Sequence, residues 1–274
     1  MRVFVYPIKL KSHRDKFPVY LGGDLHYGDP NCDEDAWKRL IDSAKNDKPN
    51  TKVVLMGDYI YSFPKDDRRN WGLRPKHGSV IDLYSNVRDS IIPIKNRVVT
   101  CLSGNHDEDW MKSENIDFVN WMCAELGIPH GGYESYIRFK VTVDGDCDSR
   151  RNVDLLVWHG AGGGRTVGGA MNRARSPIDA FRKPNVVAMG HLHRIGMTHE
   201  QWMDIDEDRL DVVETDQYFI LTGGYQRGYS PPDSSYISRQ MLAPVAIGGI
   251  KLIIQPFKNV GDKDKLDIQI EEVR

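Results

Sequence analysis

The chain has 274 residues, of which 40% are hydrophobic and 28% are charged. This composition is typical of a soluble globular protein that is long enough to bury a sizeable core. The formal net charge of -2 excludes a general electrostatic attraction to nucleic acid or to anionic membranes, although it is compatible with a local basic groove. No apolar run has the length of a membrane span, and the N-terminus lacks the apolar segment of a signal peptide. We therefore expect a cytoplasmic protein with no membrane partner.

The first half of the chain predicts strands that alternate with helices. Apolar runs predict strands at residues 3–6, 17–21, 53–56 and 98–102. Asp33 and Ser79 are candidate N-caps, each followed by an amphipathic helical pattern, and Pro93 stops the second of these helices. Residues 104–107 (GNHD) are interpreted as a turn, and a third helix is expected over residues 116–126.

The second half of the chain is richer in strands. They are predicted at residues 136–143, 154–158, 186–189, 218–222, 245–255 and 266–270. A glycine-rich, basic stretch over residues 160–183 either shapes a pocket or is a loop followed by a helix with a solvated basic face. There is no internal repeat or low-complexity linker, and the four cysteines lack C-x-x-C or zinc-ribbon spacing. We therefore expect reduced thiols in a single domain over residues 1–274.

Metal-ligating or proton-transfer side chains directly follow five of the predicted strands. They are Asp24 and His26, Asp58, Asn105 and His106, His159, and His191 and His193. Continuous apolar runs that alternate with helices favour a mainly parallel sheet, in which ligands bind beyond the carboxyl ends of the strands. The i, i+2 spacing of the first and last pairs would point both side chains to one side of an extended segment. The set exceeds the needs of one ion and fits two divalent ions about 3.5–4 Å apart.

Each of these residues also has an ordinary structural interpretation. A single Asp after a strand, such as Asp58, is usually a turn or helix cap, and a single His such as His159 is more often a satisfied or exposed histidine than a ligand. Their joint occurrence at five strand ends, in this order, is what favours a metal centre. The other histidines, at positions 13, 77, 130 and 199, lie in polar loops with no partner pattern.

The order of these motifs resembles that of the calcineurin-like metallophosphoesterases. The motifs are DxH at 24–26, GD at 57–58, GNHD at 104–107, His159, and GHxH at 190–193. The resemblance implies an α/β fold, namely a four-layer α/β/β/α sandwich of two mixed β-sheets with a two-metal site at its rim. In the implied assignment of ligands, Asp24, His26 and His193 hold one ion, Asn105, His159 and His191 hold the other, and Asp58 bridges them. Manganese is the expected metal, and iron or zinc also suits such nitrogen and oxygen donors.

The same resemblance makes His106 a catalytic residue and not a metal ligand. A water or hydroxide between the ions would attack phosphorus in line, and His106 would stabilise the phosphoryl oxygens or protonate the leaving alkoxide. Many members, including the Ser/Thr phosphatases, have an Asp that orients this His at the position of Tyr61, and in those phosphatases an Arg follows at the position of Ser62. This departure argues against a protein Ser/Thr phosphatase. It leaves Asp107, or a residue elsewhere, to orient His106.

Several residues are candidate substrate contacts. Arg165, Arg173 and Arg175 could contact phosphate oxygens, as could the backbone N–H groups of residues 162–164. Candidate stacking platforms for a base are Tyr27, Trp71, Tyr225 and Tyr229.

Retention of His106 favours a leaving group that needs a proton, so the expected function is hydrolysis of a nucleotide-type phosphodiester. The second candidate is a DNA or RNA nuclease that uses a local basic groove, and the third is a phosphomonoesterase. The complete set of ligand positions argues against a binding scaffold that has lost catalysis. The expected partner is a phosphoester, with nucleotides and nucleic acids as candidates, and the sequence leaves the oligomeric state open.

Overall fold

The structure is a computed structural model that describes residues 1–66, 78–164, 166–181, 184–206, 210–229, 241, 244, 246–257 and 266–274. Its strands form two six-stranded sheets. The first sheet contains, in spatial order, β1 (Arg2–Leu10), β6 (Glu134–Val143), β7 (Asp146–Trp158), β8 (Val186–Met189), β10 (Asp211–Thr222) and β9 (Ile195–Asp206). The second contains β12 (Asp267–Val273), β11 (Gly249–Gln255), β2 (Phe17–Gly22), β3 (Lys52–Leu55), β4 (Val98–Leu102) and β5 (His130–Gly132). Both sheets mix parallel and antiparallel pairs.

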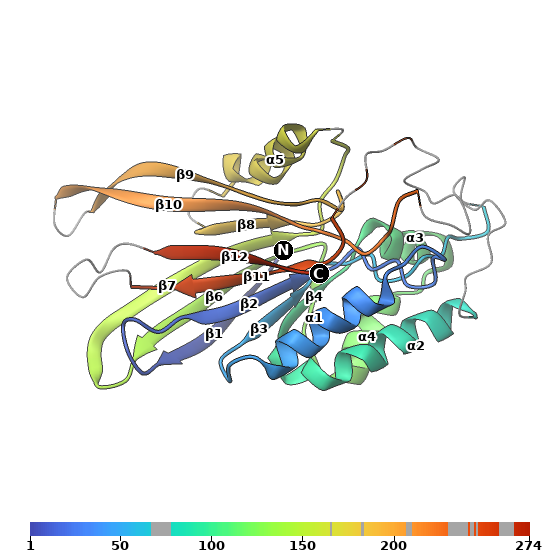
Figure 1. The fold of residues 1–274 in the computed structure, drawn as a ribbon, viewed down its shortest axis with the longest axis horizontal. Coiled ribbons are helices and arrows are strands. Elements are labelled where there is room, and N and C mark those ends of the chain that lie inside the picture. Colours follow the sequence, from blue (N-terminus) through green and yellow to red (C-terminus); the bar gives the residue numbers. More distant parts are fainter. Residues whose placement is uncertain are drawn as a thin grey trace.

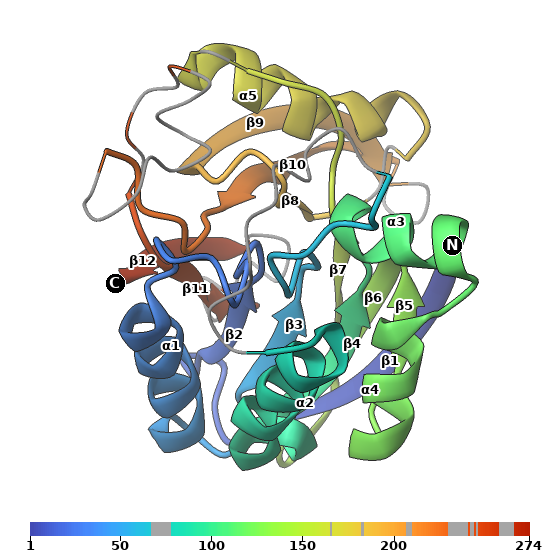
Figure 2. The same ribbon diagram turned by 90° about the vertical axis from the view of Figure 1, so that its right-hand side faces the viewer.

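The helices lie on the outer faces of the two sheets. They are α1 (Glu34–Asn46), α2 (Val80–Ile91), α3 (Asn105–Glu114), α4 (Phe118–Leu126) and α5 (Val167–Arg175), with the 3-10 helices η1 (Ile92–Arg97) and η2 (Ser176–Asp179). The sheets pack face to face, with α1, α2 and α4 against the second sheet and α5 against the first (Figure 1 and Figure 2). This arrangement confirms the predicted α/β/β/α sandwich.

The central strands of the second sheet are buried on both faces, which explains their continuous apolar runs. Along β2, Val19 and Leu21 belong to the core between the two sheets, whereas Tyr20 belongs to the core under the helices. Along β3, Val54 faces the other sheet, and Val53 and Leu55 face the helices. Alternate residues of one strand therefore fill two separate cores.

The helix ends follow local signals in the sequence. The Asp33 side chain accepts a hydrogen bond from the Ala36 N–H, and Ser79 forms a capping box with the third residue of α2. Helix α2 ends at Ile91, and Pro93 lies in the 3-10 helix that follows, because proline cannot donate the next helical hydrogen bond.

Two expectations differ from the structure. The five strand ends do not belong to one sheet: β2, β3 and β4 lie in the second sheet, and β7 and β8 lie in the first. The site residues therefore gather at a rim that both sheets share. Residues 104–107 are not a turn, because Asn105 begins α3 and the Asp107 carboxylate accepts a hydrogen bond from the Gly104 N–H at the start of this helix. The acidic side chain three residues after Gly104 was the sequence signal for this helix start.

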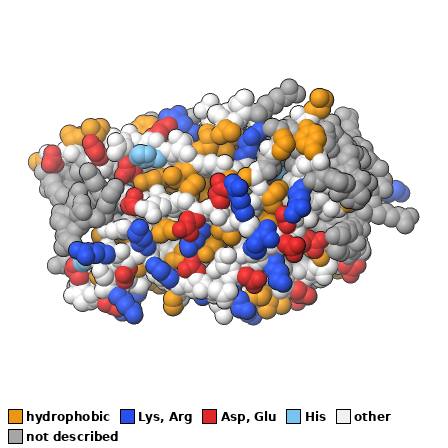
Figure 3. Space-filling model, in the orientation of Figure 1, with side chains coloured by type: hydrophobic (Ala, Val, Ile, Leu, Met, Phe, Trp, Pro, Cys, Tyr) orange, Lys and Arg blue, Asp and Glu red, His pale blue; other side chains and the backbone are white. Residues whose placement is uncertain are grey.

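The surface has no dominant charge on the face drawn in Figure 3. On the described residues of that face, Lys and Arg side chains are interspersed with Asp and Glu side chains, in keeping with the net charge of -2. Among the described parts of the chain, no helix is long and apolar enough to cross a membrane.

Candidate metal centre

The first group of candidate ligands joins the end of β2 to the loop after β8. Asp24, His26 and His193 each present a ligand atom, and these atoms all lie within 4.8 Å of one another. His26 Nε2 is 3.1 Å from His193 Nε2, and His193 Nε2 is 3.4 Å from Asp24 Oδ1. Asp24 and His26 are buried. Two imidazole nitrogens and a carboxylate oxygen that converge in this way form a pocket for a cation.

The second group lies beside the first and joins β3, β4, β7 and β8. Ligand atoms of Asp58, His159 and His191 also lie within 4.8 Å of one another. His159 Nε2 is 3.3 Å from Asp58 Oδ2 and 3.2 Å from Asn105 Oδ1. All seven predicted ligand residues thus lie in two adjacent groups. A third group of His26, Asp58 and His106 overlaps both of them, so Asp58 lies between the two.

Backbone carbonyl groups orient two of the histidine rings. His159 Nδ1 is 2.8 Å from the Met56 carbonyl oxygen, and His191 Nε2 is 3.0 Å from the Gly162 carbonyl oxygen. A carbonyl oxygen accepts hydrogen bonds and cannot donate them, so in each ring the nitrogen beside the carbonyl carries the proton. When such a ring is neutral, its other nitrogen can present a lone pair to a cation in the site. This is the usual outer-shell arrangement of a metal-binding histidine.

The electrostatics of the centre favour positive charge at His159. Burial alone lowers the pKa of His159, but the carboxylates of Asp58 and Asp24 outweigh this effect and raise the pKa to about 10. At His26 the balance is reversed, because burial and a positive charge on His106 lower the pKa. A cation bound beside Asp58 would therefore take over the charge that a proton on His159 carries in its absence.

The ligand residues lie on unusual backbone. Positive φ angles of 49° to 65° occur at Asp24, His26, Asp58, His191 and His193. The expectation that each i, i+2 pair lies on an extended segment was therefore wrong. Left-handed backbone costs a residue that is not glycine about 1–3 kcal/mol, and it persists where the surrounding structure fixes it. Here the turns are tied together, since the Asp24 N–H donates to the Gly57 carbonyl and the His26 N–H donates to the Asp58 carbonyl.

Asp58 is held from one side and presents its other side to the histidines. Its Oδ1 atom accepts a hydrogen bond of 2.9 Å from the backbone N–H of His106, in the first turn of α3. Its Oδ2 atom lies 3.3 Å from His159 Nε2 and 3.8 Å from His26 Nε2. Gly104 makes this packing possible, because a Cβ at Gly104 would lie 2.0 Å from Asp58 Oδ1. The close approach of two backbones therefore requires glycine.

Asp107 links the two turns that carry Asp58 and Gly104. Its Oδ2 atom accepts hydrogen bonds of 2.8 Å from the backbone N–H groups of both residues. Its Oδ1 atom accepts a hydrogen bond of 2.6 Å from the Tyr84 hydroxyl on α2. The carboxylate is thus directed at the backbone of the turns, and the structure does not support Asp107 as the group that orients the His106 ring. Sequence reasoning missed Tyr84, which has the appearance of an ordinary core residue of α2.

We expect the Tyr84→Phe substitution to weaken metal binding, although Tyr84 is not itself a candidate ligand. The buried Asp107 carboxylate would lose one donor, at a cost of about 1.5–3 kcal/mol in the free energy of unfolding. Looser Asp58 and Gly104 turns should lower metal affinity by roughly ten- to a hundredfold. Equilibrium unfolding and metal titration measure the two effects.

A matched control for this experiment is Tyr20→Phe. The Tyr20 hydroxyl donates to Asp47 Oδ2 at 2.7 Å at the C-terminal end of α1, and neither residue belongs to a group of candidate ligands. This variant should lose stability and keep its metal affinity. Equal metal affinity in both variants would contradict the role given to Tyr84.

His106 lies between two rings at the edge of the centre. It packs edge-on against His26 at a centroid distance of 4.9 Å and at a tilt against Phe63 at 5.0 Å. Tyr61, which stands where many relatives have the orienting Asp, is buried and packs edge-on against Phe63 at 5.3 Å. Aromatic contacts thus lie where a carboxylate would otherwise orient the imidazole. His106 Nε2 is 3.9 Å from Asp58 Oδ2, so it faces the candidate ligands.

The three arginines that were candidate phosphate contacts differ in their position relative to the metal centre. Arg165 lies outside the described residues. Arg175 forms two hydrogen bonds with the Glu200 carboxylate, at 2.7 and 3.1 Å, which direct it to β9 and away from the centre. Arg173 is exposed and lies against the loop beside His191, since a Cβ at Gly162 would be 3.3 Å from Arg173 Cζ. The structure therefore brings Arg173, and not Arg175, toward the site.

The residues that were candidate stacking platforms for a base also differ in their burial. Tyr225 is fully buried and packs edge-on against Trp37 at 5.4 Å, so it is a core residue and no platform for a base. Tyr27 is half-buried, and its N–H donates to the Tyr59 carbonyl. Tyr229 is exposed, and Trp71 lies outside the described residues.

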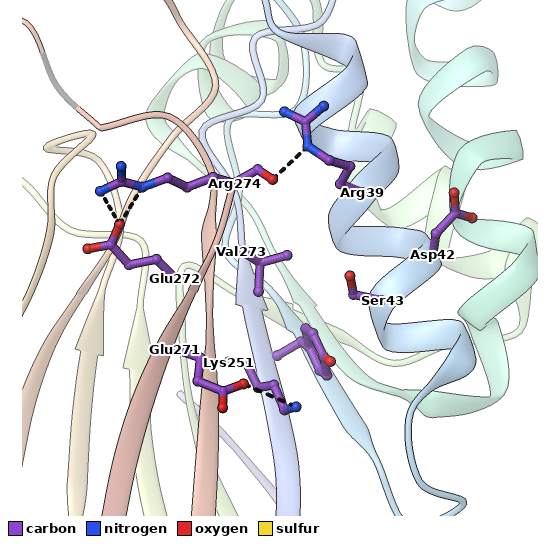
Figure 4. A pocket seen from close by; sticks show the side chains of 9 residues that line it. Arg39, Asp42, Ser43, Lys251, Glu271, Glu272, Val273 and Arg274 are labelled. Atoms are coloured by element: carbon purple, nitrogen blue, oxygen red, sulfur yellow. Dashed lines mark hydrogen bonds and ion pairs between the residues drawn. The ribbon is translucent and has the colours of Figure 1, made fainter.

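A pocket of about 420 Å³ lies away from this centre, between α1 and the two neighbouring strands β11 and β12 (Figure 4). It is lined by Tyr20, Arg39, Asp42, Ser43, Lys251, Glu271, Glu272, Val273 and Arg274. Its basic groups already have partners, as Lys251 does with Asp47 and Glu271, and Arg274 with Glu272. This pocket offers no set of metal-ligating or proton-transfer groups comparable to the centre.

Comparison with known families agrees with this centre. The family model of the calcineurin-like phosphoesterases matches residues 17–195, which is more than half of the chain and contains every candidate ligand. The chain belongs to the calcineurin-like phosphoesterase family. No curated protein matches the sequence. Among solved structures, the chain is similar to the Haemophilus influenzae NAD nucleotidase, with 11% identity, a TM-score of 0.40, and coverage of 94% of this chain and 50% of that chain. The chain thus spans about half the length of that protein.

Calcineurin-like phosphoesterases hydrolyse phosphoesters with bound metal ions, and the donors of this chain fit such ions. The candidate groups bring imidazole nitrogens and carboxylate and amide oxygens, which are the donor atoms that divalent ions accept, within a few ångströms of one another. His26 Nε2 and His193 Nε2, for example, face each other at 3.1 Å and can share at most one proton when both rings are neutral. Among the described residues, the buried His26 Nδ1 also has no hydrogen-bond partner. A bound cation would instead accept a lone pair from each of the two facing nitrogens.

Proposed function

We propose that this calcineurin-like phosphoesterase is a two-metal phosphodiesterase that hydrolyses a nucleotide-type diester. Asp24, His26 and His193 would hold one divalent ion. Asn105, His159 and His191 would hold the other, and Asp58 would contact both. The mixed nitrogen and oxygen donors suit manganese, and they also suit iron or zinc. Bound ions of this kind supply positive charge to the phosphoryl oxygens and lower the pKa of the attacking water.

The observation that carries the proposal is the position of His106. Its imidazole lies beside both ligand groups, with Nε2 3.9 Å from Asp58 Oδ2. His26 and Phe63 flank the ring and limit its rotation. From this position His106 would bind a phosphoryl oxygen or donate a proton to the leaving oxygen. Such a donor matters most for the alkoxide leaving group of a nucleotide diester, which is a poor leaving group without a proton.

We expect His106→Ala to keep the metals and to slow turnover. Because His106 is not an assigned ligand, metal content should stay near that of the unaltered protein. For diesters with an alkyl leaving group, kcat should fall by roughly 10²–10⁴. For diesters with a p-nitrophenyl leaving group, which departs without a proton, the fall should be much smaller. An equal loss for both leaving groups would exclude proton donation and leave charge stabilisation as the role of His106.

The deciding experiment compares bis-p-nitrophenyl phosphate with p-nitrophenyl phosphate. The protein is first freed of metal with a chelator and then restored with manganese. We expect metal-dependent turnover that favours the diester. Preference for the monoester would contradict the proposal and favour a phosphomonoesterase. A nuclease would be distinguished by DNA affinity that falls steeply with salt, because binding to the phosphate backbone releases counterions.

A further inference from the structure

Arg173 differs from its neighbour Arg175 in the partners of its guanidinium group. Both lie in the last turn of α5, so both carry a positive charge on the same helix. The Arg175 guanidinium donates two hydrogen bonds to the Glu200 carboxylate, with lengths of 2.7 and 3.1 Å. Within the described residues, the exposed Arg173 guanidinium makes no ion pair and no hydrogen bond. No described residue therefore occupies the donors with which this guanidinium could bind a ligand.

The backbone at Gly162 connects Arg173 to the metal centre. Gly162 has a φ of +86°, and a Cβ at this position would lie 3.3 Å from both Cζ and Nε of Arg173. The guanidinium thus packs directly against this peptide. The carbonyl oxygen of Gly162 is in turn 3.0 Å from His191 Nε2. One residue of the glycine-rich loop therefore separates the free guanidinium from a candidate metal ligand.

We propose that Arg173 forms an anion subsite beside His191, which binds a second anionic group of the substrate apart from the reacting phosphoryl group. The inference rests on the proposed function, because it assigns a substrate class to the same site. Ions held by the candidate ligands would supply positive charge for the reacting phosphoryl oxygens. A planar guanidinium beside that centre suits another phosphate, which it can bind through two hydrogen bonds.

The two sides of the centre suggest which part of the substrate carries this second anion. His106, the proposed proton donor, lies next to the apolar ring of Phe63 and the ring of His26. Arg173 instead lies next to Gly162 and His191. The leaving group would lie on the side of His106. The second phosphate would belong to the part of the substrate that retains the reacting phosphoryl group.

The test uses two diesters that differ by one phosphate. They are the 5′-p-nitrophenyl phosphate of thymidine and the same ester that also carries a 3′-phosphate. On protein restored with manganese, we expect the 3′-phosphorylated ester to have the higher kcat/KM. Arg173→Ala should lower kcat/KM for this ester by roughly ten- to a hundredfold, mainly through KM, because a hydrogen-bonded charge pair is lost. The ester without the 3′-phosphate should change less than about twofold.

The matched control is Arg175→Ala, which removes the same charge from the same helix and should leave both esters nearly unchanged. Arg173→Lys should restore part of the preference, since it keeps the charge without the planar pair of donors. Equal losses on both esters after Arg173→Ala, or no loss on either, would overturn the subsite.

A binding measurement separates this inference from the proposed function. Thymidine 3′,5′-bisphosphate and thymidine 5′-monophosphate are titrated calorimetrically into the manganese-restored protein. A preference for the bisphosphate that disappears in Arg173→Ala would support the subsite even if diesters were not hydrolysed. Equal affinity for the two nucleotides in the unaltered protein would overturn the subsite even if diesters were hydrolysed.

Discussion

Replacing Gly104 by alanine is expected to abolish activity and most metal binding. A Cβ at this position would lie 2.0 Å from Asp58 Oδ1 and 2.4 Å from the Asp58 backbone nitrogen. Both distances are far inside van der Waals contact. The Asp58 nitrogen belongs to the backbone, and Asp58 Oδ1 is held by its hydrogen bond from the His106 N–H. The turn that carries Asp58 and the start of α3 would have to move apart. We expect this overpacking to cost about 1–3 kcal/mol of stability and to displace Asp58, the proposed bridging ligand.

Metal content by mass spectrometry and thermal unfolding with and without manganese test this expectation. Gly168→Ala is a suitable control, because a Cβ at Gly168 in α5 would have no heavy atom within 4 Å and alanine favours the helix. This control should bind metal normally and unfold at a similar or higher temperature. Full metal content in Gly104→Ala would mean that α3 can shift without disturbing Asp58.

The change Asp58→Asn is expected to lower activity at least a hundredfold and to reduce metal occupancy at both positions. The amide has nearly the same shape as the carboxylate, and its oxygen can still accept the hydrogen bond from the His106 N–H. The fold should therefore persist. What disappears is the negative charge that lies 3.3 Å from His159 Nε2 and 3.8 Å from His26 Nε2. Manganese should then raise the unfolding temperature much less than in the unaltered protein, because ligand stabilisation falls with affinity.

Asp216→Asn provides a control with the same chemistry. Asp216 Oδ1 lies 3.3 Å from His199 Nε2 in a pair between β9 and β10, outside both ligand groups. Loss of this Asp–His pair should leave metal content and turnover unchanged. If Asp58→Asn also kept full metal content and normal turnover, Asp58 would not bridge the two groups.

The arrangement of His106 shows how a lost motif residue can be replaced. Tyr61 stands where many relatives have an orienting Asp, so another contact must align the imidazole of His106, the proposed catalytic residue. Tyr61 packs against Phe63, and Phe63 packs against His106. Packing can fix the plane of a ring, but unlike a carboxylate it adds no negative charge beside it. A negative charge near the His106 ring comes from the Asp58 carboxylate, whose Oδ2 atom is 3.9 Å from His106 Nε2.

The sequence by itself indicated the central strands, the starts of α1 and α2, and the residues that lie together at the centre, but not the start of α3. Buried strands such as β3 and β8 follow from short apolar runs, because they are covered on both faces. The caps of α1 and α2 follow from Asp33 and Ser79, whose side chains bond to backbone groups only three residues away. The ligand residues lie together as predicted, since each directly follows a strand end. Their roles as ligands stay a prediction.

Only the tertiary structure decided how these residues are held. The turns that carry the candidate ligands have left-handed backbone, which their local sequence does not indicate. Tyr84 bonds to Asp107, and Phe63 packs against His106. In both pairs the local sequence of one residue gives no sign of the other. The difference between Arg173 and Arg175 is of the same kind. Two arginines two positions apart on one helix have the same local pattern, and the position of Glu200 on β9 decides which of them forms an ion pair among the described residues. Local propensity reaches only a few residues along the chain, whereas such contacts depend on which distant surfaces the packed sheets bring together.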